Sequence, residues 1–135
     1  MRSRSAASAA LLLLLAACAI RHDPCPGRGT MRETQLFFGL GRADGPAVSD
    51  GEWRTFMAEV VTPRFPGGLT VLDAEGQYAS RPSSAVQHER TRIVVLVHDG
   101  GDTADAAIDE IVRDYRRRFA QESVLRVDIS AAVAY

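Results

Sequence analysis

The sequence predicts an α+β domain with the element order β-α-β-β-α-β. Two helical patterns of apolar residues are separated by strand patterns, and strands also open and close the series. A Pro/Ser turn at residues 81–84 joins the two middle strands, as expected of a hairpin. Right-handed crossovers then give a four-stranded antiparallel sheet with both helices on one face, the ferredoxin-like split βαβ arrangement.

The first half of this domain supplies a strand, a helix and a second strand. Residues 35–40 alternate, so that Leu36, Phe38 and Leu40 point one way and Phe37 the other. Residues 49–52 match a capping box and precede one apolar helical stripe made of Trp53, Phe56, Met57, Val60 and Val61. The second strand is expected at residues 69–72, with an interruption at Gly76 and a continuation at 77–79.

The second half begins with a strand at residues 92–98, which is apolar on both faces and is therefore expected at the centre of the sheet. Asp102 or Thr103 is expected to cap the second helix. Its buried stripe consists of Ala104, Ile108, Ile111, Tyr115 and Phe119. In the last strand we expect Leu125, Val127, Ile129, Ala131 and Val133 to face inward, and Arg126, Asp128 and Ser130 to face outward.

The first 17 residues predict a cleaved bacterial signal peptide. Arg2 and Arg4 precede an apolar run over residues 6–17, whose helical length of about 18 Å is too short for a bilayer core of about 30 Å. Residues 15–18, Leu-Ala-Ala-Cys, are similar to a lipobox. That resemblance implies that Cys18 carries acyl chains such as palmitate, and that the protein is exported and anchored to the periplasmic or extracellular face of the cell envelope. The alternative is an ordinary cleavage site with an incidental cysteine.

Residues 18–33 are rich in proline and glycine and predict a flexible tether, followed by a domain over residues 34–135. Cys25 in this tether is the one remaining thiol. An idle thiol is the simpler interpretation, and pairing with another chain in an oxidising compartment is the alternative.

Composition excludes several kinds of chemistry. All 16 basic residues are arginines, so lysine Schiff-base and lysine general-base chemistry is excluded. A formal net charge of −1 leaves no strong field, which makes nucleic acid a poor candidate partner. The glycines at 39, 41 and 45 do not have dinucleotide-loop spacing, and the loop after His98 lacks a second histidine for a metal. We therefore expect no cofactor and no metal.

Four segments resemble an uncharacterised family of exported bacterial proteins whose domain has no assigned function. They are LFFG at 36–39, TPRFP at 62–66, GLTV at 68–71 and QESVLR at 121–126. The resemblance extends over about residues 33–135. The family commonly has a tryptophan where this chain has Tyr78. The resemblance to this family implies no activity, cofactor or catalytic residue.

Six polar residues near the ends of predicted elements are candidates for a cleft: Arg64, Glu89, Arg92, Gln121, Ser123 and Arg126. In this fold those ends can converge on an anion- or carbonyl-binding cleft. The alternative is a structural ion pair beside a helix terminus. No Ser-His-Asp, Cys-His or paired-carboxylate arrangement has useful spacing, so no catalytic residue is identified.

The sheet face opposite the helices is the second candidate site. We expect Phe37, Val94 and Leu96 at its middle, with His98 beside them. An uncovered apolar face of this kind favours a second subunit or a ligand. Two functions stay open. One is a binding or interaction module held at a membrane surface, which forms a homodimer through this face or binds an apolar ligand there. The other, by fold analogy, is a small cofactor-free enzyme acting on a small organic molecule in a cavity on the same face.

Overall fold

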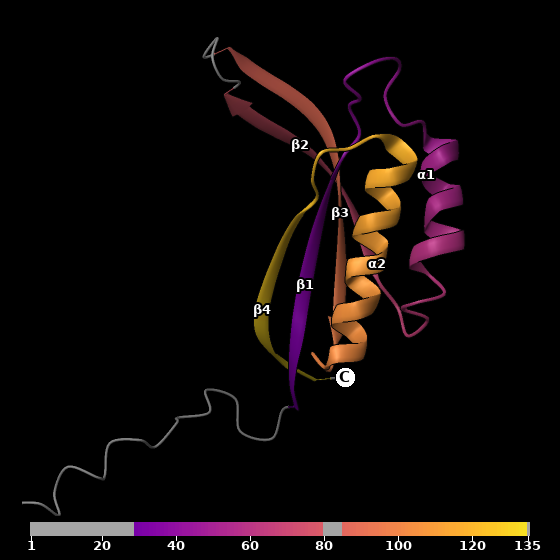
Figure 1. The fold of residues 1–135 in the computed structure, drawn as a ribbon. Helices are drawn as coiled ribbons and strands as arrows, with labels where there is room; N and C mark the ends of the chain where they lie inside the picture. Colours follow the sequence, from indigo (N-terminus) through magenta and orange to yellow (C-terminus); the bar gives the residue numbers. More distant parts are fainter. Residues whose placement is uncertain (1–28, 80–84, 135) are drawn as a thin grey trace, which may run out of the picture.

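The computed structural model describes residues 29–79 and 85–134, which form a sheet and a helical layer (Figure 1). The elements are β1 (Gly29–Gly39), α1 (Asp50–Phe56), the π-helical turn η1 (Met57–Val61), β2 (Thr70–Ala79), β3 (Val86–His98), α2 (Asp102–Phe119) and β4 (Leu125–Val133). The predicted signal peptide, Cys18, Cys25 and the turn at 81–84 lie outside the described residues. In the part that is described, no helix is long and apolar enough to span a membrane.

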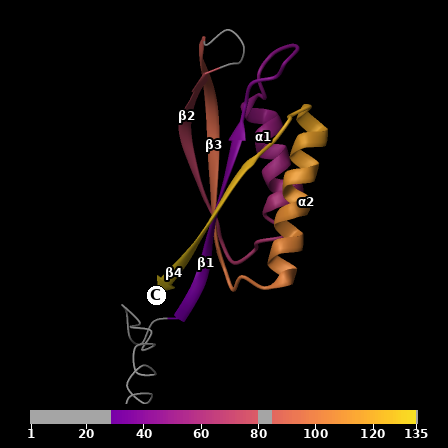
Figure 2. The ribbon, with the colours of Figure 1, turned by 60° about the vertical axis from the view of Figure 1, so that its left-hand side comes forward.

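The predicted element order and sheet are confirmed. The strand order is β2-β3-β1-β4, and all three strand pairs are antiparallel. The two central strands are therefore β1 and β3, as right-handed crossovers require. Figure 2 shows α1 and α2 side by side on one face of the sheet, while no helix of residues 29–79 and 85–134 covers the other face.

Local signals place the helix starts to within one residue. The Glu52 N–H donates to Ser49 Oγ at 3.2 Å, and the Ser49 N–H donates to Glu52 Oε2 at 2.8 Å, which confirms the capping box. The expected cap of α2 is wrong, because its N-cap is Gly101 and Asp102 is already helical. The carboxylate of Asp99 accepts the Gly101 N–H at 3.2 Å and so orders the turn before the helix.

The strands are longer than the apolar alternation indicates. β1 begins at Gly29, because Arg32 and Thr34 continue its pairing with β3 and β4 although they are polar. β2 passes through Gly76 without interruption, and β3 begins at Val86. Beyond Gly39, β2 and β3 pair mainly with each other. Backbone pairing therefore extends beyond the part of each strand that packs against the helices.

The core lies between the sheet and the helices. Its sheet side is formed by Leu36, Phe38 and Leu40 of β1 with Val94 and Leu96 of β3. The helical side consists of Trp53, Phe56, Val60, Val61, Ile108, Ile111, Tyr115 and Phe119, and Val48 closes the end. The Phe38 ring lies at the centre of the aromatic group, with centroid distances of 4.6 Å to Tyr115, 5.4 Å to Trp53 and 5.9 Å to Phe56.

The register between β1 and β3 corrects the expected open face. Leu36 is opposite Val94, and Thr34 is opposite Leu96, so Val94 and Leu96 lie on the helix side and are fully buried. His98 lies on that side too, and is 7% exposed. Of the four residues expected on the open face, only Phe37 is there. Since β3 is apolar on both faces, its sequence pattern does not indicate which residues point towards the helices. Only the pairing register with β1 determines this.

β4 faces the opposite way from the prediction. Arg126 and Asp128 point towards α2 and β1, where they form ion pairs and hydrogen bonds. Leu125, Val127 and Ile129 therefore lie on the side without helices. The physical reason is that α2 presents Asp105 and Asp109 to this end of the sheet. These carboxylates attract Arg126, so the charged face of β4 lies against the helix.

Candidate functional site

The side of the sheet without helices carries several large apolar side chains, and we call the eight of them that form paired rows the open sheet face. Across the paired strands these residues form three rows: Leu72, Ile93, Phe37 and Leu125; then Val95 and Val127; then Val97 and Ile129. Several are well exposed, with Leu125 at 59%, Leu72 at 48% and Ile129 at 45%. Two polar side chains of β1 interrupt the second and third rows: Gln35 lies between Val95 and Val127, and Glu33 lies between Val97 and Ile129. Gln35 Nε2 donates to Glu33 Oε1 at 2.7 Å.

Two of the six predicted cleft residues meet at one point. The Gly41 N–H donates to Glu89 Oε1 at 2.9 Å, and the amide of Gln121 donates to the Gly41 carbonyl. Glu89 lies directly over Gly39, where an added Cβ would come within 2.5 Å of Glu89 Oε1, so a larger residue at position 39 would displace the Glu89 carboxylate from its contact with Gly41. On the helix side the Tyr115 hydroxyl donates to the Gly39 carbonyl at 2.7 Å. These contacts fix the end of β1.

The other four cleft residues lie elsewhere. Arg92 pairs with Asp50 at 2.7 Å and Asp73 at 3.1 Å, with its guanidinium 5.3 Å from the centre of the Trp53 ring. Arg64 pairs with Glu110 of α2 at 3.0 Å and donates to the Val60 carbonyl at 2.7 Å. Arg126 belongs to the polar cluster described next, and Ser123 is exposed. The six residues therefore do not form a single cleft.

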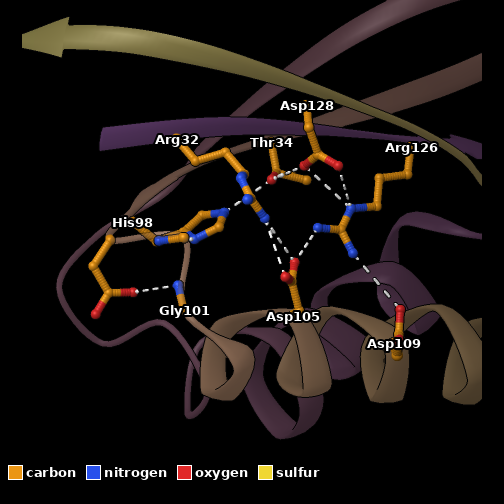
Figure 3. Close-up of polar contacts among 10 residues, drawn as sticks. Arg32, Thr34, His98, Gly101, Asp105, Asp109, Arg126 and Asp128 are labelled. Carbon is orange, nitrogen blue, oxygen red and sulfur yellow. Dashed lines mark hydrogen bonds and ion pairs between the residues drawn. The ribbon is translucent and has the colours of Figure 1, made fainter. Parts of the chain in front are cut away.

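A polar cluster fills the space between the start of α2 and strands β1, β3 and β4 (Figure 3). A chain of hydrogen bonds runs through its buried part. The Gly100 N–H donates to His98 Nδ1 at 3.1 Å, which leaves the proton on Nε2 to be donated to Thr34 Oγ1 at 2.8 Å. Thr34 in turn donates to Asp128 Oδ1 at 2.5 Å. Every polar atom of the Thr34 and His98 side chains is thus used.

Two arginines close the solvent side of the cluster. Arg32 donates to both carboxylate oxygens of Asp105 at 3.1 Å, and Arg126 pairs with the same carboxylate. Arg126 also contacts Asp128 at 2.9 Å and Asp109 at 3.7 Å. Two positive charges thus face three negative ones, so the cluster has no excess of positive charge with which to hold an anion.

The pKa values follow this geometry. Burial lowers the pKa of His98 below its ordinary value, and the charge of Arg32 lowers it further. The hydrogen bond from Arg126 lowers the pKa of Asp105, to which Arg32 adds. Burial alone would raise the pKa of Asp128, but the hydrogen bonds from Thr34 and Arg126 outweigh it and the pKa falls. The histidine is therefore neutral and both aspartates are ionised at pH 7.

This arrangement does not suit covalent catalysis. The order His-Thr-Asp is similar to a nucleophilic triad, but Thr34 is 0% exposed and no substrate can reach its hydroxyl. His98 donates to Thr34 rather than accepting from it, which is the wrong direction for a general base. Among the described residues no group of three or more potential ligands converges on a metal position. The cluster therefore serves to join α2 to the sheet.

Two residues of the cluster, Arg126 and His98, were predicted site residues, but their partners Arg32, Thr34, Asp105 and Asp128 were not. One signal was present. Arg32 and Thr34 are at even positions, as are the core residues Leu36 and Phe38, so alternation already places them on the helix side. Polar residues on the buried face of a strand need polar partners, and the start of α2 is acidic.

The fold is similar to that of proteins of known structure. A phage SAM lyase in complex with S-methyl-5′-thioadenosine has a TM-score of 0.60 and 16% identity, over 76% of this chain and 83% of that chain. A phage SAM lyase in its apo state has a TM-score of 0.54 and 14% identity, over 78% of this chain and 92% of that chain. CutA from Synechococcus elongatus PCC7942 has a TM-score of 0.52 and 8% identity, over 78% and 80%.

These likenesses show the fold alone, because all three identities are low. No curated protein matches the chain. A family model described as "Protein of unknown function (DUF3574)" matches residues 33–135, which is nearly the whole of the domain. The expectation of an uncharacterised family is therefore confirmed, and the chain belongs to the DUF3574 family.

Proposed function

We propose that this domain is an interaction module at a membrane surface, and that its open sheet face binds a second copy of the chain. The observation that carries the proposal is the composition of that face, where eight large apolar side chains lie without a helix over them. A surface of this kind on a small domain marks an interaction site, because exposing it to water is unfavourable.

A twofold axis along β1 makes the open sheet face complementary to itself. Each β1 then lies across the β1 of the other copy, and the apolar residues of β3 lie against those of the partner's β4, which flank β1 on either side. The axis also places Glu33 and Gln35 of each copy opposite their own counterparts. The two facing Glu33 carboxylates oppose association, and the Gln35 amides, each of which donates to the Glu33 carboxylate of its own copy at 2.7 Å, lie beside them. Burial of the apolar rows against each other is what favours a second copy.

An axis in this direction also suits anchoring of both copies to one membrane. It leaves the two β1 strands starting at the same end of the dimer, and β1 begins 11 residues after Cys18. If Cys18 carries acyl chains, both anchors enter the same bilayer, and confinement to that surface raises the effective concentration of the copies.

The anchor is tested by Cys18→Ser. We expect the wild-type protein in the membrane fraction and the variant in the soluble envelope fraction, because the serine hydroxyl does not replace the thiol that receives the lipid. Fractionation of cells followed by immunoblotting measures the distribution. The control is Cys25→Ser, which should remain in the membrane fraction. A Cys18→Ser protein that stays in the membrane pellet would contradict the anchoring proposal.

Self-association is tested by Phe37→Asp. The substitution places a carboxylate at the middle of the open sheet face, and burying that charge against a second copy is strongly unfavourable. We expect at least a roughly tenfold weaker association, which corresponds to about 1.4 kcal/mol. Sedimentation of residues 19–135, which contain the entire core, measures it, with a reducing agent present so that Cys25 cannot link copies. The control is Thr55→Asp on an exposed position of α1, which should associate like the wild type.

A wild-type chain that remains monomeric across the micromolar range would contradict the proposal. It would favour the second candidate, a small cofactor-free enzyme with a small organic molecule on the same face. Fold likeness to a phage SAM lyase in complex with S-methyl-5′-thioadenosine is the observation in its favour. The residue suited to such chemistry is Glu89, a half-buried carboxylate at the end of the open sheet face, whose Oε1 already accepts from Gly41.

A further inference from the structure

Glu33 places a carboxylate among the apolar side chains of the open sheet face. It lies in the third row, where its backbone pairs with Val97 of β3 on one side and with Ile129 of β4 on the other. The side chain is half-buried there, and its hydrogen bond comes from Gln35 Nε2 at 2.7 Å. A charge among apolar side chains is unfavourable unless it is paired, so the position of Glu33 needs an explanation.

No positive charge lies beside Glu33 to offset its own. None of the described ion pairs of residues 29–79 and 85–134 includes Glu33. The adjacent Arg32 lies on the helix side, where it pairs with Asp105. The next titratable group after β3 is Asp99, whose carboxylate accepts the Gly101 N–H. The residues that surround Glu33 on the open side of the sheet are uncharged: Met31, Gln35, Val95, Val97, Val127, Ile129 and Ala131.

The twofold axis along β1 brings the Glu33 carboxylates of two copies together. Each residue of β1 then faces its own counterpart, and two sheets packed about 10 Å apart leave room only for the side chains between them. Val97 and Ile129 flank the two carboxylates in both copies. Two carboxylates that share a site of this kind cannot both be ionised without strong repulsion. Association is therefore opposed as long as both Glu33 side chains are charged.

A single proton removes this repulsion. A protonated carboxyl group has an O–H that donates to the ionised carboxylate facing it, and a hydrogen bond of this type is short and strong. The Gln35 amide donates to Oε1 of Glu33 in its own copy, which leaves Oε2 for the bond between copies. The proton is taken from the solvent, so the associated state holds one proton more than two separate copies do.

We propose that protonation of the facing Glu33 pair controls self-association through the open sheet face, so that two copies associate more tightly as the pH falls. This inference rests on the proposed function and adds its regulation. The direction follows from linkage, because lowering the pH favours whichever state binds more protons. Uptake of one proton raises the association constant by up to about tenfold for each unit of pH.

The first experiment compares Glu33→Gln with wild type at pH 7.5, by sedimentation of residues 19–135 with a reducing agent present. Glutamine keeps the shape of glutamate and removes its charge. We expect Glu33→Gln to associate at least about tenfold more tightly than wild type. The control is Glu59→Gln, which removes the same charge from η1 in the helical layer, where Glu59 pairs with Arg118 at 2.8 Å. It should associate within about twofold of wild type.

The second experiment repeats the measurement at pH 5.5. We expect wild type to associate at least about tenfold more tightly than at pH 7.5, and Glu33→Gln to change by less than about threefold. Groups that titrate elsewhere in the domain, such as His88, are present in both proteins, so the difference between them reports on Glu33. Far-ultraviolet circular dichroism at both pH values checks that each protein is folded.

The outcomes separate this inference from the proposed function. Equal pH dependence for wild type and Glu33→Gln would overturn the control by Glu33 and leave the open sheet face as an interface. Weaker association of Glu33→Gln than of wild type at pH 7.5 would do the same, because Glu33 would then be a favourable contact. A wild-type chain that remains monomeric at both pH values would overturn both proposals.

Discussion

Phe38→Ala should lower the free energy of unfolding by about 3–5 kcal/mol. Phe38 is 0% exposed, and its ring contacts those of Trp53, Phe56 and Tyr115, which come from both helices. Truncation removes the transfer free energy of the ring and leaves a cavity that three large neighbours cannot fill without moving. Urea denaturation of residues 19–135, followed by fluorescence of Trp53, measures the change.

The preceding residue provides the matched control. Phe37 has the same side chain on the same strand, but it points to the open sheet face. Measured at concentrations where the chain is dissociated, Phe37→Ala should cost no more than about 1 kcal/mol, because it leaves no enclosed cavity. Equal losses for the two variants would mean that Phe37 is packed within the folded monomer, and would remove the basis of the proposed interface.

Thr34→Val should lower the free energy of unfolding by about 1–3 kcal/mol. Valine has nearly the shape of threonine, so packing is kept and only the hydroxyl is lost. That hydroxyl accepts from His98 Nε2 and donates to Asp128, and its loss leaves the buried imidazole N–H without its acceptor. Denaturation at pH 7.5, where His98 is neutral in both the folded and unfolded states, isolates this effect from protonation.

Thr30→Val is the control for Thr34→Val. Thr30 lies on the same side of β1 but is exposed near its start. There the valine should change stability by less than about 0.5 kcal/mol. If Thr34→Val were as neutral as Thr30→Val, the hydrogen-bond chain from Gly100 to Asp128 would contribute nothing to stability, and the polar cluster would need another explanation.

The sequence contains enough information for the element order, the helix stripes and the capping box, because each depends on residues that are close in the chain. The stripe of Trp53, Phe56, Val60 and Val61 is an example, and all four residues are buried. The side of the sheet on which each residue lies was predictable for β1, where apolar and polar residues alternate clearly. It was not predictable for β3, since Ile93 and Val94 are equally apolar and only long-range register separates them.

β4 shows why a clear pattern can still mislead. Its alternation is correct, but the apolar side was assigned to the helices on the assumption that the charged side prefers water. In the structure the charged side meets Asp105 of α2 and Thr34 of β1, and the apolar side belongs to the open sheet face. The assignment fails because it assumes that the apolar side of every strand packs against the helices, whereas the apolar side of β4 lies on the open sheet face.

The polar cluster was partly foreseeable from Arg126, but its partners were not. Arg32 lies in a stretch whose composition predicts a tether. Asp105 lies in the first turn of α2, where a negative charge is favourable beside the helix dipole. Each of these two side chains is explained by its neighbours in the sequence, so the sequence gives no sign that the two side chains are in contact. Their contact depends on the pairing of β1 with β4, which brings Arg32 and Arg126 to the same end of α2.

The central position of β1 has a mechanical consequence for a domain held by its amino-terminal end. In the proposed anchored dimer, a pull on one copy would be transmitted to Cys18 along β1, which is hydrogen-bonded to β3 on one side and to β4 on the other. The hydrogen bonds of an antiparallel ladder run perpendicular to the strands. A load along β1 would therefore shear both ladders at once, rather than opening bonds one at a time as a pull on an edge strand would. The strand nearest the proposed lipid anchor is thus one of the two strands, with β3, whose extraction breaks two ladders at once.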